Sequence, residues 1–242
     1  MIEDHSKALL QFSGGKDSTA LLYMARPWLD RIEVAIVDAG ANFPHVQAHI
    51  ERTCERLKVA PTIIRSDARA YVAANGLPAD IVPVENFQAA PFMTDRPRLV
   101  PYLACCFANL MAPMADYVRE SGHTLVLRGS KQADARVGAP DGFMADGVEY
   151  RSPLWRWSDA EVFAYLDGLG VELPDQYAHG VNDGLDCWFC PAHMAHGGKQ
   201  RLDYIRARHP DLWPEVRKNV QQVAGIVAAQ FAIVQQAYEV AA

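Results

Sequence analysis

The chain has 242 residues, of which 50% are hydrophobic and 21% charged, and its formal net charge is −6 at pH 7. This length and composition are ordinary for a globular protein that buries a full core. The negative net charge excludes a protein that binds nucleic acid or an anionic membrane through its overall charge, so any anion site has to be a local basic pocket.

The first half of the chain alternates short apolar runs with helix-like segments, which predicts a parallel sheet with helices on both faces. The predicted strands are 7–12, 33–38, 62–65 and, further along, 124–128, and the predicted helices of this half are 18–29 and 45–57. Ligands of such sheets bind beyond the carboxyl ends of the strands. The loop after the first strand and the segment 38–43 after the second are therefore expected to face one pocket.

The middle of the chain is less regular. Residues 78–101 carry five prolines and no clean periodicity, which predicts a long loop or irregular insertion over the active face. A helix over 102–120 follows, and Pro113 inside it should kink or interrupt it. Ser158 and Glu161 form a capping box that predicts a helix running to about residue 169.

The C-terminal part, from about residue 203, is predicted to be helical. Pro210 and Pro214 divide it into a short helix and a long final helix. Apolar residues recur every three or four positions along the final helix, which indicates that it packs on the domain. A seam between the two chains of a homodimer is the weaker alternative.

The N-terminus, Met1-Ile2-Glu3-Asp4-His5, is too polar for a signal peptide, and no apolar run approaches the roughly 20 residues of a membrane span. We therefore expect a cytoplasmic protein without a membrane partner. In that compartment the five cysteines are expected to be reduced thiols, metal ligands or redox groups rather than structural disulfides.

The most informative stretch is Ser13-Gly14-Gly15-Lys16-Asp17-Ser18, between the first predicted strand and the first helix. Two adjacent glycines let the backbone tighten and approach a ligand without a clash. Such a turn presents free amide groups at a helix N-terminus, where they favour anions, and Lys16 adds a positive charge. The simplest ligand is a phosphate or a pyrophosphate. The alternative is an ordinary Gly-Gly turn with a solvated lysine.

The spacing differs from the common P-loop pattern and resembles the pyrophosphate loop, Ser-Gly-Gly-x-Asp-Ser, of the adenine-nucleotide alpha-hydrolase superfamily. That superfamily includes ATP pyrophosphatases, tRNA-thiolating enzymes and adenylylsulfate reductases. The resemblance implies a Rossmann-like α/β fold with a helical C-terminal extension and an adenine nucleotide, ATP or adenylylsulfate or its phosphorylated form, as the ligand. We expect residues 1–175 to form the nucleotide-binding domain and residues 176–242 to pack on it.

Several further residues are expected to serve the nucleotide. Lys16, Asp17 and Arg136 are the predicted catalytic residues, because two of them carry charge that stabilises a leaving pyrophosphate. Asp17 and Asp38 are candidate Mg²⁺ ligands, although Asp38 serves equally well as a cap of its own loop. The predicted nucleotide-binding residues are Ser13, Gly14, Gly15, Lys16, Asp17, Ser18, Asp38, Ala39, Gly129, Lys131 and Arg151.

The cysteines form a doublet, Cys105 and Cys106, and a Cys-x-x-C pair, Cys187 and Cys190. A Cys-x-x-C pair alone is compatible with zinc, with thiol–disulfide exchange or with an iron–sulfur cluster. Adjacent residues are unusual ligands of structural zinc, whereas they can reach two different irons of a cubane. The alternative is that Cys105 and Cys106 are core thiols on a helix.

The doublet and the pair together resemble the [4Fe–4S] signature of assimilatory adenylylsulfate reductases, which belong to the phosphoadenylylsulfate reductase family. Four further segments resemble segments of that family in the same order, namely 38–44, 105–114, 128–136 and 152–158. The resemblance extends from residue 13 to about residue 191. It implies a [4Fe–4S] cluster held by Cys105, Cys106, Cys187 and Cys190.

Two departures from that family bear on function. Its reductases carry a nucleophilic cysteine in a C-terminal tail, and no cysteine follows Cys190 in this sequence. Leu110 stands where the family has a lysine beside the cluster. The one remaining thiol, Cys54, is expected to be buried on its helix.

Taken with these departures, the resemblance to sulfur-transferring relatives implies an enzyme that cleaves ATP to AMP and pyrophosphate and so activates an acceptor, a nucleic acid or a small molecule, for sulfur transfer. The alternatives are a reductase of adenylylsulfate or phosphoadenylylsulfate with a thiol supplied elsewhere, and a non-catalytic nucleotide-binding subunit of a modification complex. The expected protein partner is a sulfur donor or reductant of the cysteine desulfurase or thioredoxin type.

Overall fold

A computed structural model of the chain describes residues 2–80, 99–134, 141–182, 184–195 and 197–241. Its centre is a six-stranded sheet in the order β3-β2-β1-β6-β8-β7. The strands are β1 (Ala8–Gln11), β2 (Ile32–Asp38), β3 (Thr62–Arg65), β6 (Leu125–Leu127), β7 (Phe143–Ala145) and β8 (Val148–Arg151). Neighbouring strands pair in parallel except β7, which pairs antiparallel with β8 at the edge. The predicted parallel sheet is confirmed.

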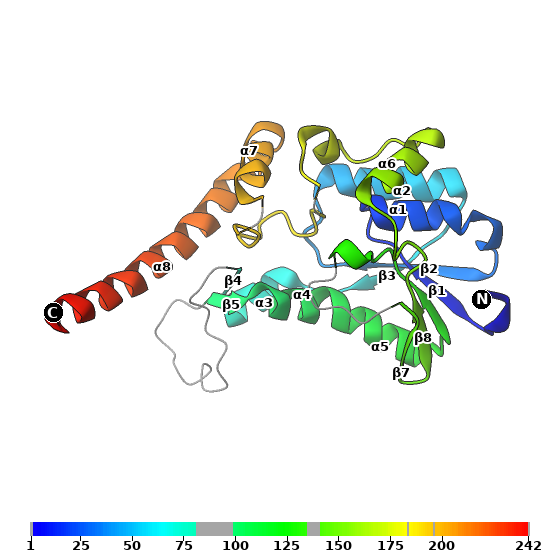
Figure 1. The fold of residues 1–242 in the computed structure, drawn as a ribbon, viewed down its shortest axis with the longest axis horizontal. Coiled ribbons are helices and arrows are strands. Elements are labelled where there is room, and N and C mark those ends of the chain that lie inside the picture. The colour runs from blue at the N-terminus through cyan, green and yellow to red at the C-terminus, as the bar shows by residue number, and fades with distance from the viewer. Residues whose placement is uncertain (1, 81–98, 135–140, 183, 196, 242) are drawn as a thin grey trace.

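Helices cover both faces of the sheet, as Figure 1 shows. On one side lie α1 (Lys16–Met24), α2 (Pro44–Leu57) and α6 (Asp159–Gly168), and on the other α3 (Ala68–Asn75), α4 (Tyr102–Cys106) and α5 (Ala112–Ser121). Successive residues of a strand face opposite sides, so the central strand serves two cores. Leu10 packs with Leu22 of α1 and Ile50 of α2, whereas Leu9 packs with Met114 and Val118 of α5.

The predicted helix over 102–120 is interrupted, as its proline indicated. A π-helical turn, Phe107–Met111, separates α4 from α5. Pro113 has no N–H for the carbonyl four residues earlier and would clash with it in a regular helix. That carbonyl, of Asn109, accepts a hydrogen bond from the hydroxyl of Ser66 instead. The wider turn therefore accommodates the proline and leaves a backbone acceptor for the neighbouring loop.

The prediction of an irregular loop over residues 78–101 is wrong at both ends of that range. Leu77–Ala79 (β4) and Leu99–Pro101 (β5) pair in parallel as a separate two-stranded sheet. The proline content concealed these short strands, because proline is tolerated at an edge where its nitrogen faces away from the ladder. Residues 81–98 of this prediction lie outside the described part of the chain.

Besides β4 and β5, the sequence interpretation missed α3, β7 and β8. The hairpin β7–β8 has a recognisable signal in its turn, where Asp146 and Gly147 both have positive φ, 50° and 79°. Asp-Gly between two strands is typical of a type I′ turn. The flanking strands are only three and four residues long, too short to show the alternation that predicts a strand.

The C-terminal part contains a short 3-10 helix, η6 (Asp175–His179), and two α-helices, α7 (Gly198–Arg208) and α8 (Trp213–Ala241). Val181, Ile205 and Val216 belong to the same hydrophobic cluster as β1 and α1. The expected domain boundary between residues 175 and 176 stays a prediction. Hydrophobic residues on both sides of that boundary belong to this one cluster. Figure 1 shows α8 leading away from the sheet, with the C-terminus at its far end.

The far half of α8 exposes large apolar side chains, among them Phe231 and Tyr238, the latter 76% exposed. The homodimer seam expected on this helix stays a prediction. None of the helices in the described ranges is long and apolar enough to cross a membrane.

Candidate functional site

The glycine loop, residues 13–18, joins the end of β1 to the start of α1. Gly14 has φ +77°, and a Cβ there would lie 2.6 Å from Cγ1 of Ile50. Only glycine meets both conditions without strain. Gly15 is the N-cap of α1 and has no side chain to cap the helix. The sharp turn predicted from the sequence is therefore present, and the N-cap residue itself adds no side-chain cap to the helix start.

Hydroxyl groups stabilise the glycine loop through hydrogen bonds to its own backbone. The Ser18 hydroxyl accepts a hydrogen bond from the Ser13 N–H at 3.2 Å and donates to the Gly15 carbonyl at 3.1 Å. The Thr19 hydroxyl also donates to the Gly15 carbonyl and lies 3.1 Å from Nε2 of His49. Ser18 is buried, whereas Ser13 is exposed. Of the two serines predicted to bind the nucleotide, Ser18 shapes the loop and Ser13 faces solvent.

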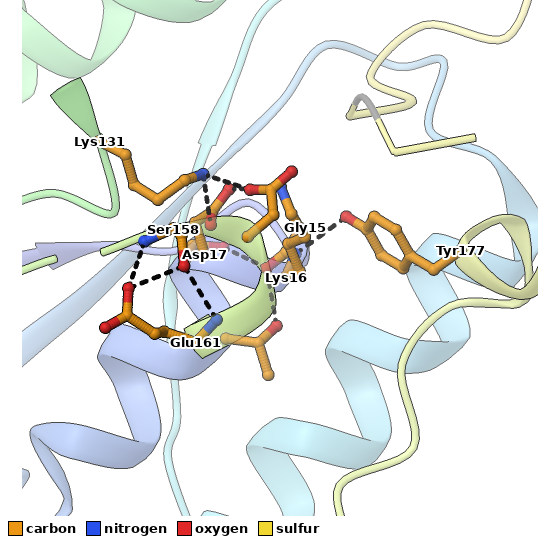
Figure 2. Close-up of polar contacts among 10 residues, drawn as sticks. Gly15, Lys16, Asp17, Lys131, Ser158, Glu161 and Tyr177 are labelled. Carbon is orange, nitrogen blue, oxygen red and sulfur yellow. Dashed lines mark hydrogen bonds and ion pairs between the residues drawn. The ribbon is translucent and has the colours of Figure 1, made fainter. Parts of the chain in front are cut away.

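Two buried lysines converge beside the loop, as Figure 2 shows. Lys16 begins α1, and Lys131 lies after β6, yet both ammonium groups reach the carboxylate of Asp17. The distances are 3.0 Å from Lys16 Nζ to Asp17 Oδ2 and 2.8 Å from Lys131 Nζ to Asp17 Oδ1. The lysine side chains are only 6% and 1% exposed. The fold thus brings together three predicted site residues, two of them cationic, beside the loop.

Asp159, which the sequence analysis did not select, is the fourth member of this cluster. Its Oδ1 lies 3.2 Å from Lys16 Nζ and 3.1 Å from Lys131 Nζ. Partial burial raises the pKa of Asp159, but hydrogen bonds and charge from the two lysines outweigh this and lower it below its usual value. Lys16, Asp17, Lys131 and Asp159 form a closed ring of alternating charges, which we call the lysine–aspartate quartet.

The position of Lys131 depends on Gly129. A Cβ at residue 129 would lie 2.8 Å from the Ser18 nitrogen and 2.9 Å from the Asp17 carbonyl carbon, so only glycine lets this loop touch the start of α1. The Gln132 N–H donates to the Trp155 carbonyl at 2.8 Å and ties the same loop to the segment before α6. Two contacts therefore fix Lys131 between the glycine loop and Asp159.

Asp159 is positioned by the capping box predicted from the sequence. Ser158 is the N-cap of α6, its hydroxyl accepts from the Glu161 N–H, and the Glu161 carboxylate accepts from the Ser158 N–H. Figure 2 shows this box next to the lysines. Asp159 is the first residue of the helix. The box was recognised from its spacing, but nothing in the sequence indicated that the next side chain meets two lysines.

Tyr177 is a second residue that sequence reasoning missed. Its hydroxyl oxygen accepts a hydrogen bond from the Lys16 N–H at 2.9 Å, across 161 positions of sequence (Figure 2). Burial raises the pKa of Tyr177 to about 12, so the hydroxyl keeps its proton at neutral pH. The first backbone amide of α1, which an anion would otherwise meet, is thus in contact with a neutral hydroxyl from η6.

The segment after β2 has a structural role in this arrangement. The Gly40 N–H donates to Asp38 Oδ1 at 2.9 Å, so this carboxylate caps its own loop, the second of its two predicted roles. Ala39 is buried, and its carbonyl accepts from the Ala68 N–H. The Ala41 carbonyl accepts from the Trp188 N–H at 3.1 Å and so ties this segment to the loop of the Cys-x-x-C pair.

The two predicted arginines differ. Arg151 pairs with Glu149 at 3.1 Å and with Asp141 at 3.5 Å, and in the described part of the chain its ion pairs are all with these two acidic residues. It therefore meets hairpin carboxylates rather than the glycine loop. Arg136 lies outside the described residues, so its predicted role stays a prediction.

All four cysteines of the doublet and the pair line one pocket between α4 and the loop before α7, which we call the cysteine pocket. Burial raises the pKa of each thiol, to about 11 for Cys105 and about 12 for Cys106. Nearby charges add to this effect, because the Cys187 pKa is raised further by Asp186 and then by the other three thiols. The fold thus gathers cysteines that are 80 residues apart in the sequence.

The pocket also supplies groups that stabilise thiolates. The Asn109 amide donates to Cys105 Sγ at 3.6 Å, and the positive charge of Arg201 lowers the pKa of Cys190 against the stronger effect of burial. Within the described ranges, no three His, Cys, Asp or Glu residues are arranged to hold a metal ion. A cubane, in contrast, takes each thiolate on a separate iron. Four thiols that line one pocket, with an amide and a guanidinium beside them, match that donor set in residue type. Cys54 is buried in the main core instead.

Comparisons with known proteins identify relatives of this chain in sequence and in fold. The sequence model of the family described as the phosphoadenosine phosphosulfate reductase domain matches residues 7–193. An adenosine 5'-phosphosulfate reductase of Deinococcus radiodurans is 25% identical over 201 residues, which cover 81% of this chain and 71% of that protein. An uncharacterised protein of Methanocaldococcus jannaschii is 18% identical over 212 residues. These cover 85% of this chain and 44% of that protein, so the chain spans less than half the length of this relative.

Among solved structures, the phosphoadenylyl-sulfate reductase of Candida auris, determined as a phosphate complex, superimposes with a TM-score of 0.54. The match covers 74% of this chain and 81% of that chain at 16% sequence identity. At this identity the likeness concerns the fold alone. It confirms the predicted α/β architecture, in which a mostly parallel sheet carries helices on both faces.

Proposed function

We propose that this chain, which belongs to the phosphoadenosine phosphosulfate reductase domain family, binds ATP and cleaves it between the α- and β-phosphates. The acceptor's oxygen attacks the α-phosphorus, the bond to the bridging oxygen breaks, and pyrophosphate leaves with the electron pair. The adenylated acceptor is then open to a sulfur nucleophile that displaces AMP. The acceptor is a nucleic acid or a small molecule, and the sulfur comes from a donor protein of the cysteine desulfurase type.

The observation that carries this proposal is the pair of buried ammonium groups beside the glycine loop. Lys16 and Lys131 lie within 3.2 Å of the same carboxylate oxygen, so a phosphate oxygen at that point would meet two positive charges at once. Charge-assisted contacts of this kind are shorter and stronger than neutral ones. Preorganised positive charge is most effective where negative charge develops, which in this reaction is the leaving pyrophosphate.

The cysteines support sulfur activation over reduction. Four of the five thiols line the cysteine pocket, and the fifth, Cys54, is 7% exposed in the core, where burial raises its pKa. Attack on a sulfate sulfur needs an accessible thiolate. Cys54 and Cys105 are buried, and the three partly exposed thiols line the cysteine pocket, where burial raises their pKa, so none of the five is well placed for this attack.

Cys105, Cys106, Cys187 and Cys190 would hold a [4Fe–4S] cluster, for which the donor set of the pocket is suited. Such a group supplies one-electron redox chemistry or a fixed local charge when bound. Asn109 and Arg201 would orient and stabilise the ligating sulfurs, as partners outside a metal site commonly do. Mg²⁺ bound to the phosphates stays a prediction, since both Asp17 oxygens contact lysines here.

The alternative is reduction of adenylylsulfate or phosphoadenylylsulfate to sulfite with electrons from a thioredoxin-type protein. The 25% identity to a D. radiodurans protein named as an adenosine 5'-phosphosulfate reductase favours it. In this case a partner thiol would form the covalent intermediate.

One pair of assays separates these functions. The protein is purified without oxygen and incubated either with ATP, sulfide and a protein-free cell extract as the source of acceptors, or with adenylylsulfate, thioredoxin and a thioredoxin reductase system. Sulfur activation predicts equal amounts of AMP and pyrophosphate from ATP and no sulfite. Sulfite from adenylylsulfate without AMP from ATP would instead establish the reductase. Tight ATP binding without turnover would indicate a non-catalytic nucleotide-binding subunit.

A matched pair of lysine variants localises the activity. Lys131→Met removes a buried ammonium group of the quartet, whereas Lys199→Met changes a lysine whose side chain is 88% exposed. We expect Lys131→Met to lower pyrophosphate release about 100-fold or more, and Lys199→Met to leave it unchanged. Equal activity of the two variants would contradict the proposed role of the quartet.

A further inference from the structure

The four members of the lysine–aspartate quartet differ in their access to solvent. The side chains of Lys16 and Lys131 are 6% and 1% exposed, and that of Asp17 is 22% exposed. Asp159 is 47% exposed and presents a single oxygen, Oδ1, to both ammonium groups. Asp159 is therefore the outermost member, and its oxygen lies where a ligand entering from solvent would first meet the lysines.

Asp159 can leave this position without disturbing its helix. The capping box of α6 uses the side chains of Ser158 and Glu161, and the Asp159 carboxylate takes no part in it. Asp159 also lies in the first turn of α6, where the helix dipole stabilises a carboxylate that has turned toward solvent. Asp17, in contrast, is held by both lysines through two different oxygens and lies inside the loop itself.

We propose that Asp159 is a specificity-determining residue whose carboxylate occupies the position of the ligand group bonded to the α-phosphate, and so selects a polyphosphate tail over a phosphosulfate. This inference rests on the proposed function of the same site. A ligand must displace or outweigh the Asp159 carboxylate before it reaches Lys16 and Lys131. Asp159 is thus a positioning residue that acts through the lysines and takes no part in bond making.

The selection follows from charge. A sulfate end carries one negative charge, equal to that of a carboxylate, and the tethered carboxylate competes at a high effective concentration. The β- and γ-phosphates of ATP together carry up to three charges and offer more oxygens to the two ammonium groups, so this tail displaces the carboxylate more readily than a sulfate does. Loss of the carboxylate should therefore favour phosphosulfate ligands more than polyphosphates.

The test compares binding of ATP and adenylylsulfate to the full-length protein and to Asp159→Asn by titration calorimetry. We expect the unaltered protein to bind ATP at least about tenfold more tightly. In Asp159→Asn the affinity for adenylylsulfate should rise about tenfold and that for ATP about threefold or less. The preference for ATP over adenylylsulfate should therefore become smaller. Asp159→Glu, which keeps the charge, should retain the preference. Asp203→Asn is the control, because Asp203 pairs with an exposed lysine outside the site.

A structural role alone would lower both affinities together or change neither, and either result would overturn the inference. Absence of binding by both ligands to the unaltered protein would also overturn it. If Asp159→Asn does not fold, Asp159→Ser provides the neutral variant. Pyrophosphate release from ATP is measured in parallel. A protein that releases no pyrophosphate but shows the narrowed preference would refute the proposed reaction and leave the selection by Asp159 standing.

Discussion

The hydroxyl of Tyr177 and the backbone N–H of Lys16 lie 2.9 Å apart, although 161 residues separate them in the sequence. This contact joins η6 to the start of α1, so the C-terminal part of the chain reaches directly into the glycine loop. Gln176, the preceding residue of η6, lies 2.6 Å from Nε2 of His45 at the start of α2. The short 3-10 helix η6 therefore contacts the N-terminal ends of both α1 and α2.

Removal of the Tyr177 hydroxyl should cost stability. In Tyr177→Phe the Lys16 N–H loses its acceptor while the ring stays in place, and we expect the free energy of unfolding to fall by about 1–2 kcal/mol. Urea unfolding followed by circular dichroism measures this loss. Tyr238→Phe is the control, since Tyr238 is 76% exposed on α8 and its variant should unfold like the unaltered protein. Equal stability of the two variants would show that the contact contributes little.

Pyrophosphate should offset the Tyr177→Phe defect in part, because an anion in the glycine loop supplies an acceptor for the freed amide. We expect pyrophosphate to raise the melting temperature of Tyr177→Phe more than that of Tyr238→Phe. A smaller rise in Tyr177→Phe would indicate that the hydroxyl belongs to the anion site itself.

The glycine loop should not tolerate a side chain at residue 14. Gly14→Ala adds a Cβ 2.6 Å from Ile50 and forces alanine to adopt φ +77°, so we expect a loss of about 1–3 kcal/mol in the free energy of unfolding. Gly168→Ala is the matched control, because an added Cβ there meets nothing within 4 Å. Because residue 168 is the last residue of α6, Gly168→Ala should leave the free energy of unfolding unchanged or raise it by up to about 1 kcal/mol. Similar melting temperatures for both variants would refute the strain at Gly14.

His49 should make the protein less stable in acid. Burial, with a smaller contribution from the charge of Arg52, lowers the pKa of His49 from 6.5 to about 4. Between these values the unfolded chain binds more protons than the folded one, so stability falls as the pH decreases from about 7 toward 4. The contribution of this one residue between pH 7 and pH 5 is about 2 kcal/mol.

Urea unfolding at pH 7 and pH 5 tests the role of His49 when His49→Gln is compared with the unaltered protein. Other groups titrate in both proteins, so the quantity to compare is the loss of stability between the two pH values. We expect this loss to be about 2 kcal/mol smaller in His49→Gln. An identical loss in the two proteins would show that His49 does not titrate in this range.

The cysteine pocket predicts a difference between its thiols and Cys54. Protein purified without oxygen should be brown and contain about four irons per chain if the pocket holds a cubane. We expect Cys106→Ser to lose most of this iron and Cys54→Ala to keep it, because Cys54 packs in the main core. Iron and sulfide analysis and the visible absorption measure the outcome. Zinc in place of iron, or equal iron in both variants, would contradict the proposed ligands.

Local sequence patterns were sufficient for the parts of the fold whose cause is local. The glycine loop was recognised because two adjacent glycines between an apolar run and a helix indicate a tight turn at a bare helix start. The capping box at Ser158 and the interruption near Pro113 follow from hydrogen bonds within four residues, and the structure confirms both. The third strand, Thr62–Arg65, was predicted with its observed bounds.

Only the tertiary structure determined which distant residues meet. Lys131 was expected in the nucleotide site, but its pairing with Asp17, the contact of Asp159 with Lys16 and the contact of Tyr177 with Lys16 come from packing between elements that are over a hundred residues apart. Charge and hydrogen-bonding capacity are visible in a sequence, whereas the direction in which a side chain points depends on the packing of the whole fold. The same reason explains Arg151, which has the right charge and meets Glu149 and Asp141 instead.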